Sequence, residues 1–162
     1  MTFRGLLETP VGIVAVESDG PAITRVRWPR KDFEIGESDA VVRRALSQLD
    51  AYFAGERAAF DVPFDLGVQT PTTRAVLTAL YETVAHGESV TYGELAARSG
   101  TEVPARGIGA IMGANPIPLI VPCHRVVASD GLGGYSGGAE GTGLATKRWL
   151  LEHAGALPTA LF

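Results

Sequence analysis

Apolar and polar residues alternate in two neighbouring stretches near the start of the chain. The run 11–20 is rich in strand-forming residues and ends in a turn, and the run 22–28 alternates with a period of two until Pro29. Two such runs joined by a short turn are typical of a β-hairpin. A third alternation at 60–64 predicts a further strand, and Pro63 places it at a sheet edge because proline cannot donate to the ladder.

A helical period lies between these strands. Within 38–53 the apolar residues recur every three or four positions, with Ser38 or Asp39 available as the N-cap and Gly55 just beyond the end. Such a helix would cover one face of the sheet. The first part of the chain therefore predicts a small α/β unit, which we place at residues 1–68.

Further along, the pattern changes to three short helices separated by glycine turns. The first ends near Gly87, the second occupies 92–99 with Thr91 as its cap, and the third falls within 102–113. Three such helices are compatible with a helix-turn-helix unit, in which a later helix enters a nucleic-acid groove, and also with a plain helical subdomain. Periodicity leaves both possibilities open for this second unit, residues 69–162.

Composition and charge narrow the class of protein. With 162 residues, 46% of them hydrophobic, the chain is long enough to bury a core. It has no apolar run of the ~18 residues that a membrane span needs, and its first residues lack the apolar core of a signal peptide. We therefore expect a soluble, cytoplasmic monomer with no membrane partner. Because the formal net charge is −4, binding of nucleic acid would depend on a few well-placed cations.

The chain has one cysteine, Cys123, which excludes an internal disulfide and any multi-cysteine zinc site. No metal is expected, because ligand spacing is absent among the three histidines, His86, His124 and His153. A free cysteine is most often buried as a small hydrophobe. However, Pro122 and His124 flank this one, and neither suits the middle of a buried strand. Since His124 and Arg125 are placed to stabilise a thiolate, this window leaves a structural and a reactive thiol equally open.

A series of short motifs follows in a fixed order through the second unit. They are Tyr92-Gly93-Glu94-Leu95-Ala96, Arg106-Gly107-Ile108-Gly109, Asn115-Pro116-Ile117-Pro118, Val121-Pro122-Cys123-His124-Arg125-Val126-Val127, Gly133-Gly134-Tyr135-Ser136-Gly137-Gly138 and Lys147-Arg148-Trp149-Leu150-Leu151. Their order and spacing resemble those of the 6-O-alkylguanine-DNA alkyltransferase family, the methylated-DNA-protein-cysteine methyltransferases. The likeness covers about residues 72–153, and the proline-cysteine-histidine-arginine core is highly specific. The earlier residues agree only in length and strand pattern.

The resemblance implies a ribonuclease H-like α/β N-terminal domain, built from a β-sheet and a helix, followed by a mostly α C-terminal domain with a winged helix-turn-helix. It implies a DNA repair protein that binds double-stranded DNA in the minor groove, largely independently of sequence, and flips 6-O-alkylguanine out of the stack. The alkyl group would then pass irreversibly to Cys123 as a thioether, so that each molecule acts once. No cofactor takes part.

The same resemblance implies roles for individual residues. Cys123 would accept the alkyl group, His124 would activate the thiol through an ordered water, and Asn115 would join the helix-turn-helix to the cysteine loop. A second set of residues is implied to contact DNA and to flip the base: Arg106, Tyr92, Ala105 and Gly109. Arg106 would fill the place in the stack that the flipped base leaves. The substrate pocket is implied to include the lid residues and one backbone carbonyl, from Tyr135, Ser136, Gly137 and Val126.

Two departures from the family pattern stand out. Residues 139–143 are inserted after the glycine-rich motif, which predicts a longer lid over the pocket. Family members also carry a glutamate that hydrogen-bonds the catalytic histidine, and the matching position here is Ala154. Glu152 would lie on the opposite face of the same helix, because two residues rotate a side chain by about 200°. We therefore hypothesise that Glu140 folds back to take the missing role.

Three functions remain open on this sequence. The first is a repair alkyltransferase with a changed activation relay. The second is a sensor that binds alkylated DNA without repairing it, although the alkyltransferase-like proteins of that kind replace the cysteine that is retained here. The third is a thiol acceptor for a donor other than DNA. The first requires a cavity that reaches Cys123 and is lined by Tyr92, Tyr135 and Ser136.

Overall fold

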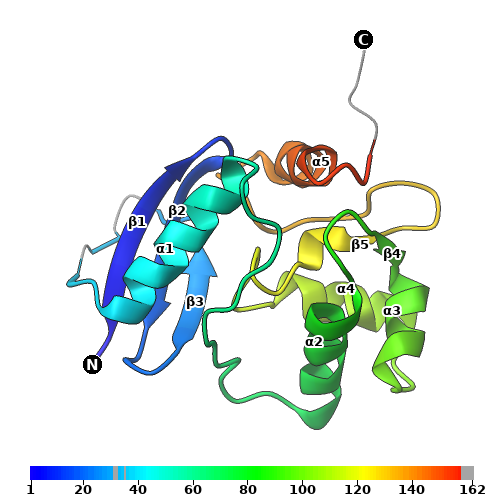
Figure 1. The fold of residues 1–162 in the computed structure, drawn as a ribbon. Helices are drawn as coiled ribbons and strands as arrows, with labels where there is room; N and C mark the ends of the chain where they lie inside the picture. The colour runs from blue at the N-terminus through cyan, green and yellow to red at the C-terminus, as the bar shows by residue number, and fades with distance from the viewer. Residues whose placement is uncertain (31–32, 35, 158–162) are drawn as a thin grey trace.

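The computed structural model describes residues 1–30, 33–34 and 36–157. The chain begins with an antiparallel sheet of three strands in the order β1 (Phe3–Thr9), β2 (Gly12–Ser18) and β3 (Ile23–Arg27), as Figure 1 shows. The predicted hairpin is β2 and β3. The predicted strand at 60–64 is wrong, since that segment makes only one isolated parallel bridge, from Phe64 to Ile23.

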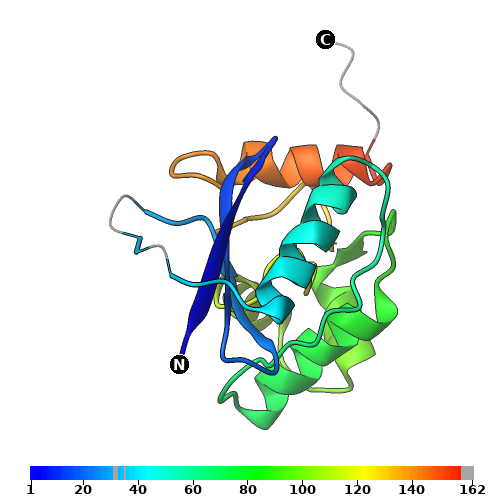
Figure 2. The same cartoon turned by 60° about the vertical axis from the view of Figure 1, so that its left-hand side comes forward.

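Helix α1 (Ala40–Phe53) covers one face of the sheet (Figure 2). Its N-cap is Asp39, whose side chain accepts a hydrogen bond from the amide of Val42, so the helix begins two residues later than Ser38. The helix packs closely on β1 at Gly5. A Cβ atom there would lie 2.7 Å from Leu46 and 2.8 Å from Val42, so the contact requires glycine.

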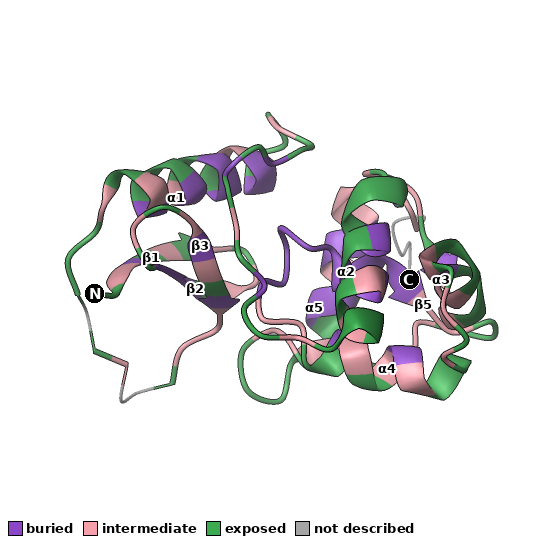
Figure 3. Ribbon diagram, turned by 90° about the horizontal axis from the view of Figure 1, so that it is seen from below, coloured by how far each residue is buried: buried purple, intermediate pink, exposed green. Residues whose placement is uncertain are grey.

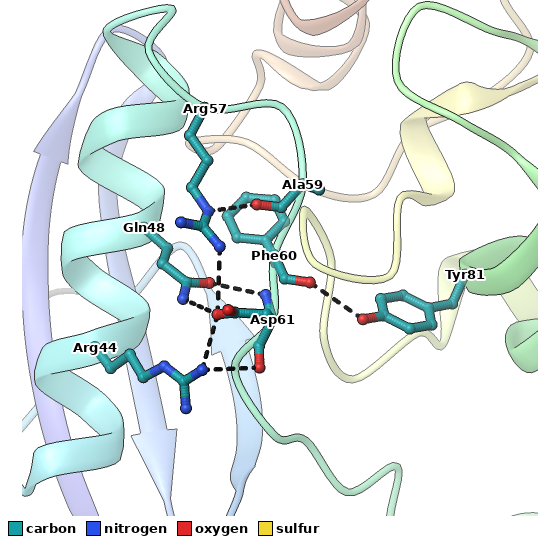
Figure 4. A network of polar contacts seen from close by, with 7 residues as sticks. All are labelled: Arg44, Gln48, Arg57, Ala59, Phe60, Asp61 and Tyr81. Atoms are coloured by element: carbon teal, nitrogen blue, oxygen red, sulfur yellow. Dashed lines mark hydrogen bonds and ion pairs between the residues drawn. The ribbon is translucent and has the colours of Figure 1, made fainter.

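The segment between the two parts of the chain is fastened at Asp61 (Figure 4). Its carboxylate accepts from Gln48 and from Arg44 of α1, and Arg57 lies 3.3 Å away. The hydrogen bond from Gln48, followed by those with Arg44, holds the pKa of Asp61 below its usual value. On the other side, the hydroxyl of Tyr81 donates to the carbonyl of Phe60. The segment therefore bridges the sheet layer and the helical part.

The second part of the chain is mostly helical, as expected. It contains α2 (Pro71–Thr83), α3 (Tyr92–Ser99), α4 (Ala105–Gly113) and α5 (Gly143–His153), with a short parallel pair β4 (Val90–Thr91) and β5 (Val126–Val127). The bounds predicted for α3 are confirmed, because Thr91 and Glu94 form a capping box and Gly100 closes the helix with φ 68°. Helix α2 ends before the expected Gly87, and α4 begins after Pro104 rather than at 102.

The two parts share one hydrophobic core and several direct contacts (Figure 3). The amide of Val26 on β3 donates to the carbonyl of Pro116, just after α4, over 3.0 Å. At the far end, a ring nitrogen of His153 on α5 lies 2.7 Å from the carbonyl of Tyr52 on α1. The first contact holds the sheet edge against the segment that leads to Cys123, and the second joins α5 to α1. Among the helices of the described residues, none is long and apolar enough to cross a membrane.

Candidate functional site

Cys123 lies at the start of a short 3-10 turn, Cys123–Arg125, which follows a buried apolar segment. Asn115 fixes this segment, since its side-chain amide donates to the carbonyl of Val121 over 2.8 Å and its oxygen accepts from the amide of Ile117. Leu119 is buried with φ 75°, a left-handed conformation that is rare for a bulky residue. The backbone before the thiol is therefore bent and tied to the end of α4.

A cavity of about 390 Å³ reaches the thiol from the side of α3 and α4. The structure brings together at this cavity several of the residues that the sequence singled out. They are Tyr92, Gly109, Cys123, Tyr135 and Ser136, joined by Met112, Gly113 and Gly134. Cys123 is only 6% exposed, but it is not sealed. The structure therefore contains the cavity that a repair alkyltransferase requires, one that reaches Cys123 and is lined by Tyr92, Tyr135 and Ser136.

The lid over this cavity is the segment between β5 and α5. The hydroxyl of Tyr92 accepts from the amide of Gly134 over 3.3 Å, and Gly133 has φ 73° and would place a Cβ 2.5 Å from that hydroxyl. Ser136 donates to the carbonyl of Gly113 at the end of α4 over 3.2 Å. The lid is thus closed against α3 and α4 by three separate contacts.

The outer side of the lid rests on the first part of the chain. The ring of Tyr135 meets Trp28 edge to face, with centroids 6.2 Å apart, and the indole nitrogen of Trp28 donates to the carbonyl of Val11. Gly137 packs against these two rings and lines a second cavity rather than the first, one that also contains Cys123. Lid and sheet therefore support each other through aromatic contact.

The thiol is held mainly in its neutral form. Burial raises the pKa of Cys123, and this outweighs the hydrogen bond from Asn115, the charge of Lys147 and two backbone amides, all of which lower it. A thiolate must therefore be formed at the moment of reaction. The proximity of His124 and Arg125 in sequence does not by itself give a thiolate at rest.

His124 is completely buried, and neither of its ring nitrogens has a hydrogen-bond partner in the described part of the chain. Burial, followed by the charges of Arg125, Lys147 and His86, holds the pKa of His124 well below its usual value. No carboxylate contributes to that shift. His124 is consequently a neutral imidazole at physiological pH and, in this surrounding, a weaker base than a free imidazole.

The hypothesis that Glu140 replaces the missing acid finds no support. Glu140 is exposed and lines a cavity beside Trp28 and Tyr135, and no hydrogen bond or ion pair in the described residues joins it to His124. Glu152 pairs instead with Arg148 of its own helix at 3.9 Å. In the part of the chain that the structure describes, no carboxylate therefore orients His124.

Arg125 does not act on the thiol, contrary to the sequence expectation. Its guanidinium donates to the carbonyl of Val84 at the end of α2, and it lies beside the hydroxyl of Tyr52. The cation next to the thiol is Lys147 of α5. Lys147 lies in the last of the family motifs, and its type and position in the sequence do not indicate this role.

Lys147 is fully buried, and its ammonium donates to the carbonyl of Val126 over 2.6 Å and to that of Gly134 over 2.9 Å. Burial lowers the pKa of Lys147 to about 8, while the neighbouring Cys123 raises it. The ammonium also lies 5.9 Å from the ring centroid of Tyr92. The signal in the sequence is positional, because a lysine occupies the same face of α5 as the buried Leu150 and Leu151.

Helix α4 presents its first turn to solvent. Ala105 and Arg106 are exposed there, and Gly109 faces Tyr92, with 4.0 Å between its ideal Cβ and the tyrosine ring. Val126 is buried and points its carbonyl to Lys147. The structure therefore groups Arg106, Ala105 and Gly109 on one helix and the pocket residues behind it.

Fold and site together define a class of protein: a two-part molecule in which a buried thiol lies behind a short exposed helix. A cavity under a glycine-rich lid reaches this thiol. Comparison with known proteins then identifies the family. Residues 71–156 match the DNA binding domain of 6-O-methylguanine DNA methyltransferase, and residues 2–66 match its ribonuclease-like domain. The chain belongs to the 6-O-methylguanine DNA methyltransferase family.

Individual relatives agree with this membership. The methylated-DNA-protein-cysteine methyltransferase of Mycobacterium bovis is 38% identical over 152 residues, 90% of this chain and 88% of the relative. That of Mus musculus is 44% identical over 117 residues, 68% of this chain and 53% of the relative. The predicted family is confirmed, and with it the prediction of a DNA repair enzyme that transfers an alkyl group to a protein cysteine.

Solved structures confirm the predicted fold class. The O6-methylguanine methyltransferase of Mycobacterium tuberculosis superposes with a TM-score of 0.83 at 34% identity, covering 99% of this chain and 98% of the other. The structure of Mycobacterium tuberculosis OGT in complex with DNA gives 0.82 at 36% identity, covering 95% and 93%. An α/β domain followed by a mostly helical DNA-binding domain is therefore the architecture of this chain.

Proposed function

We propose that the protein removes the alkyl group from 6-O-alkylguanine in duplex DNA and keeps it on Cys123 as a thioether, each molecule acting once. The observation that carries this proposal is the cavity of about 390 Å³ beside α4, in which the thiol and the side chains of Tyr92, Tyr135 and Ser136 meet. A relative from Mycobacterium tuberculosis forms a complex with DNA, which supports DNA as the partner of this chain.

The chemical step is an in-line displacement. The sulfur of Cys123 forms a bond to the alkyl carbon as the bond from that carbon to the guanine oxygen breaks, and guanine leaves with the electron pair. The thiol proton passes through an ordered water to the neutral imidazole of His124, and guanine gains one proton at a ring nitrogen. The protein therefore gives up one proton and the released guanine takes one up, so that His124 and the pocket hydroxyls end as they began. Tyr92 is placed to donate to the leaving base, since it lines the cavity and its hydroxyl accepts from Gly134 and keeps its own proton. Ser136 also lines the cavity, and its hydroxyl would turn from the carbonyl of Gly113 to the guanine oxygen when the base enters.

DNA is engaged by α4 in the minor groove, largely without regard to sequence. Ala105 and Gly109 are small enough for a close approach of the helix to the duplex, and exposed Arg106 enters the stack where the target base leaves it. Asn115 positions the cysteine loop against the end of α4. The carbonyl of Val126 has a second lone pair beyond the one used by Lys147, and Gly137 gives the lid its close packing.

A single unpaired cysteine in the chain supports action in a reducing compartment, and we infer a monomer in the cytoplasm. The test is to incubate the protein with a duplex that carries one 6-O-methylguanine and to measure the intact mass. We expect the addition of one methyl group, and no addition in Cys123→Ser. Tight binding without an adduct would establish a sensor instead, and neither binding nor adduct would favour a donor other than DNA.

A further inference from the structure

Four arginines gather on the face of the sheet opposite α1. In the strand register, Arg25 pairs with Glu17, which in turn pairs with Arg4 on β1, so these three side chains share one face. Arg27 lies two residues beyond Arg25 and points the same way, and Arg30 follows at the end of the strand. All four line one cavity of about 450 Å³ together with Trp28, Phe33 and Glu34. We call them the sheet arginines: Arg4, Arg25, Arg27 and Arg30.

The charge of this surface is only partly compensated. Glu17 accepts from Arg4 at 2.8 Å and lies 3.6 Å from Arg27, and the ring of Phe33 lies under both guanidinium groups. Arg25 and Arg30 are exposed, and within residues 1–30, 33–34 and 36–157 neither forms an ion pair. A net positive surface therefore faces solvent on a protein whose overall charge is −4.

The surface is continuous with the functional site. A second cavity, of about 560 Å³, shares Arg25, Arg27 and Trp28 with the first and extends to Gly113 and Cys123. The sheet arginines therefore lie next to the C-terminal end of α4. In Figure 3, α4 and the chain that leaves β3 lie toward the same lower side of the molecule, while α1 lies at the upper side.

Helix α4 carries little positive charge of its own. Arg106 is its only cation, and the last residue of the helix is Gly113. Because each neutralised phosphate contributes to affinity through the release of counterions, a helix with a single cation binds a duplex weakly. We propose that the sheet arginines bind backbone phosphates of the same duplex that α4 engages, so that the DNA surface extends onto the N-terminal domain. This inference rests on the proposed function in taking duplex DNA as the substrate.

The test measures the salt dependence of DNA binding in the Cys123→Ser background, where no chemistry intervenes. Arg25→Gln and the double variant with Arg30→Gln are compared with Arg43→Gln. Arg43 is an exposed arginine on α1, and its guanidinium donates to the carbonyl of Ser38. The duplex is chosen short enough to bind only one protein molecule. We expect the slope of log K against log salt to fall by about 0.9 for each sheet arginine removed and to stay unchanged in the control.

An unchanged slope in the double variant would overturn the inference. A change seen only on duplexes long enough for several molecules would also overturn it, because the surface would then contact a neighbouring copy. Thermal unfolding of each variant shows that the fold is retained. Failure of the proposed function is a separate result. If the variants bind with the expected slopes but the unsubstituted protein forms no methyl adduct, the inference about the sheet arginines stands and the proposal of alkyl transfer fails.

Discussion

At the scale of single residues, Cys123 is subject to opposed influences. Burial raises the pKa of its thiol, while Asn115 and Lys147 lower it. Lys147 is the only full charge among the groups that lower it. We therefore expect Lys147 to stabilise the thiolate by its charge, while its ammonium holds the carbonyls of Val126 and Gly134.

Lys147→Met should raise the pKa of the Cys123 thiol and slow methyl transfer at pH 7 by about tenfold for each pKa unit. The rate of the variant should recover as the pH is raised, because more thiolate then forms. Single-turnover rates from pH 6 to 10 check this. Arg148→Met is the control, since Arg148 is a half-exposed cation on the same helix. An unshifted pH profile in Lys147→Met would mean that the lysine serves structure alone.

No carboxylate of the described residues bonds to His124, and its pKa is well below the usual value. Protonation of His124 should therefore lower the methyl transfer rate only below pH 6.5. We call this fall in rate the acid limb of the pH profile. We expect Ala154→Glu to raise the pKa of His124, shift that limb toward neutral pH and speed transfer at pH 8 by tenfold or more, as an orienting acid does in a related triad. Rates between pH 5 and 8 decide it, and an unmoved limb would show that position 154 does not reach the histidine.

At the scale of elements, the lid and α3 are fitted to each other through one glycine. Gly133 has φ 73° and leaves no room for a Cβ beside the hydroxyl of Tyr92. Gly133→Ala should displace Tyr92 or the lid and lower the methyl transfer rate at least tenfold. Gly141→Ala is the matched control, because Gly141 lies in the same segment with φ 78° and no atom lies within 4 Å of a Cβ at that position. Equal rates for the two variants would contradict the role given to this contact.

How far the sequence predicts an element depends on how local its determinants are. The bounds of α3 follow from its own capping box and closing glycine, and both lie within the printed sequence of the helix. The segment at 60–64 alternates like a strand, yet side chains from α1 and α2 hold it as a connection. Strand β1 lacks a clean alternation, because Gly5 faces α1 where an apolar side chain is expected.

The same distinction applies to the site. Cys123, Asn115 and Tyr92 are recognisable because their motifs are local, and the structure brings them to one place. The role of Lys147 depends on how α5 packs against the cysteine turn and the lid, which no local pattern shows. The direction of Arg125 likewise follows from its long-range bond to Val84. Tertiary packing therefore places Lys147, rather than Arg125, next to the thiol.

At the scale of the whole molecule, the buried ammonium links stability to pH. The pKa of Lys147 is lowered from 10.5 to about 8 in the folded protein, so between these values the unfolded chain binds a proton that the folded chain does not. The free energy of unfolding should therefore rise with pH across this window. Below pH 8 both states hold the proton and the contribution is flat.

Chemical denaturation of Cys123→Ser, with and without Lys147→Met, isolates this contribution because the thiol no longer titrates. We expect the unfolding free energy of the single variant to increase between pH 8 and 10 relative to the double variant. Parallel curves would show that Lys147 keeps an ordinary pKa when folded. The result bears on the whole fold, since unfolding releases α5 from the lid and from α1 together.

Because Lys147 is buried, its chemical reactivity also reports on the opening of the lid and α5. The sequence holds only two lysines, Lys31 and Lys147. An amine that loses its proton near pH 8 is a good nucleophile in mildly alkaline solution, yet Lys147 is shielded from any reagent while α5 and the lid are closed. The rate at which an amine-reactive label modifies Lys147 would therefore measure how fast the lid opens, without a substitution in the chain.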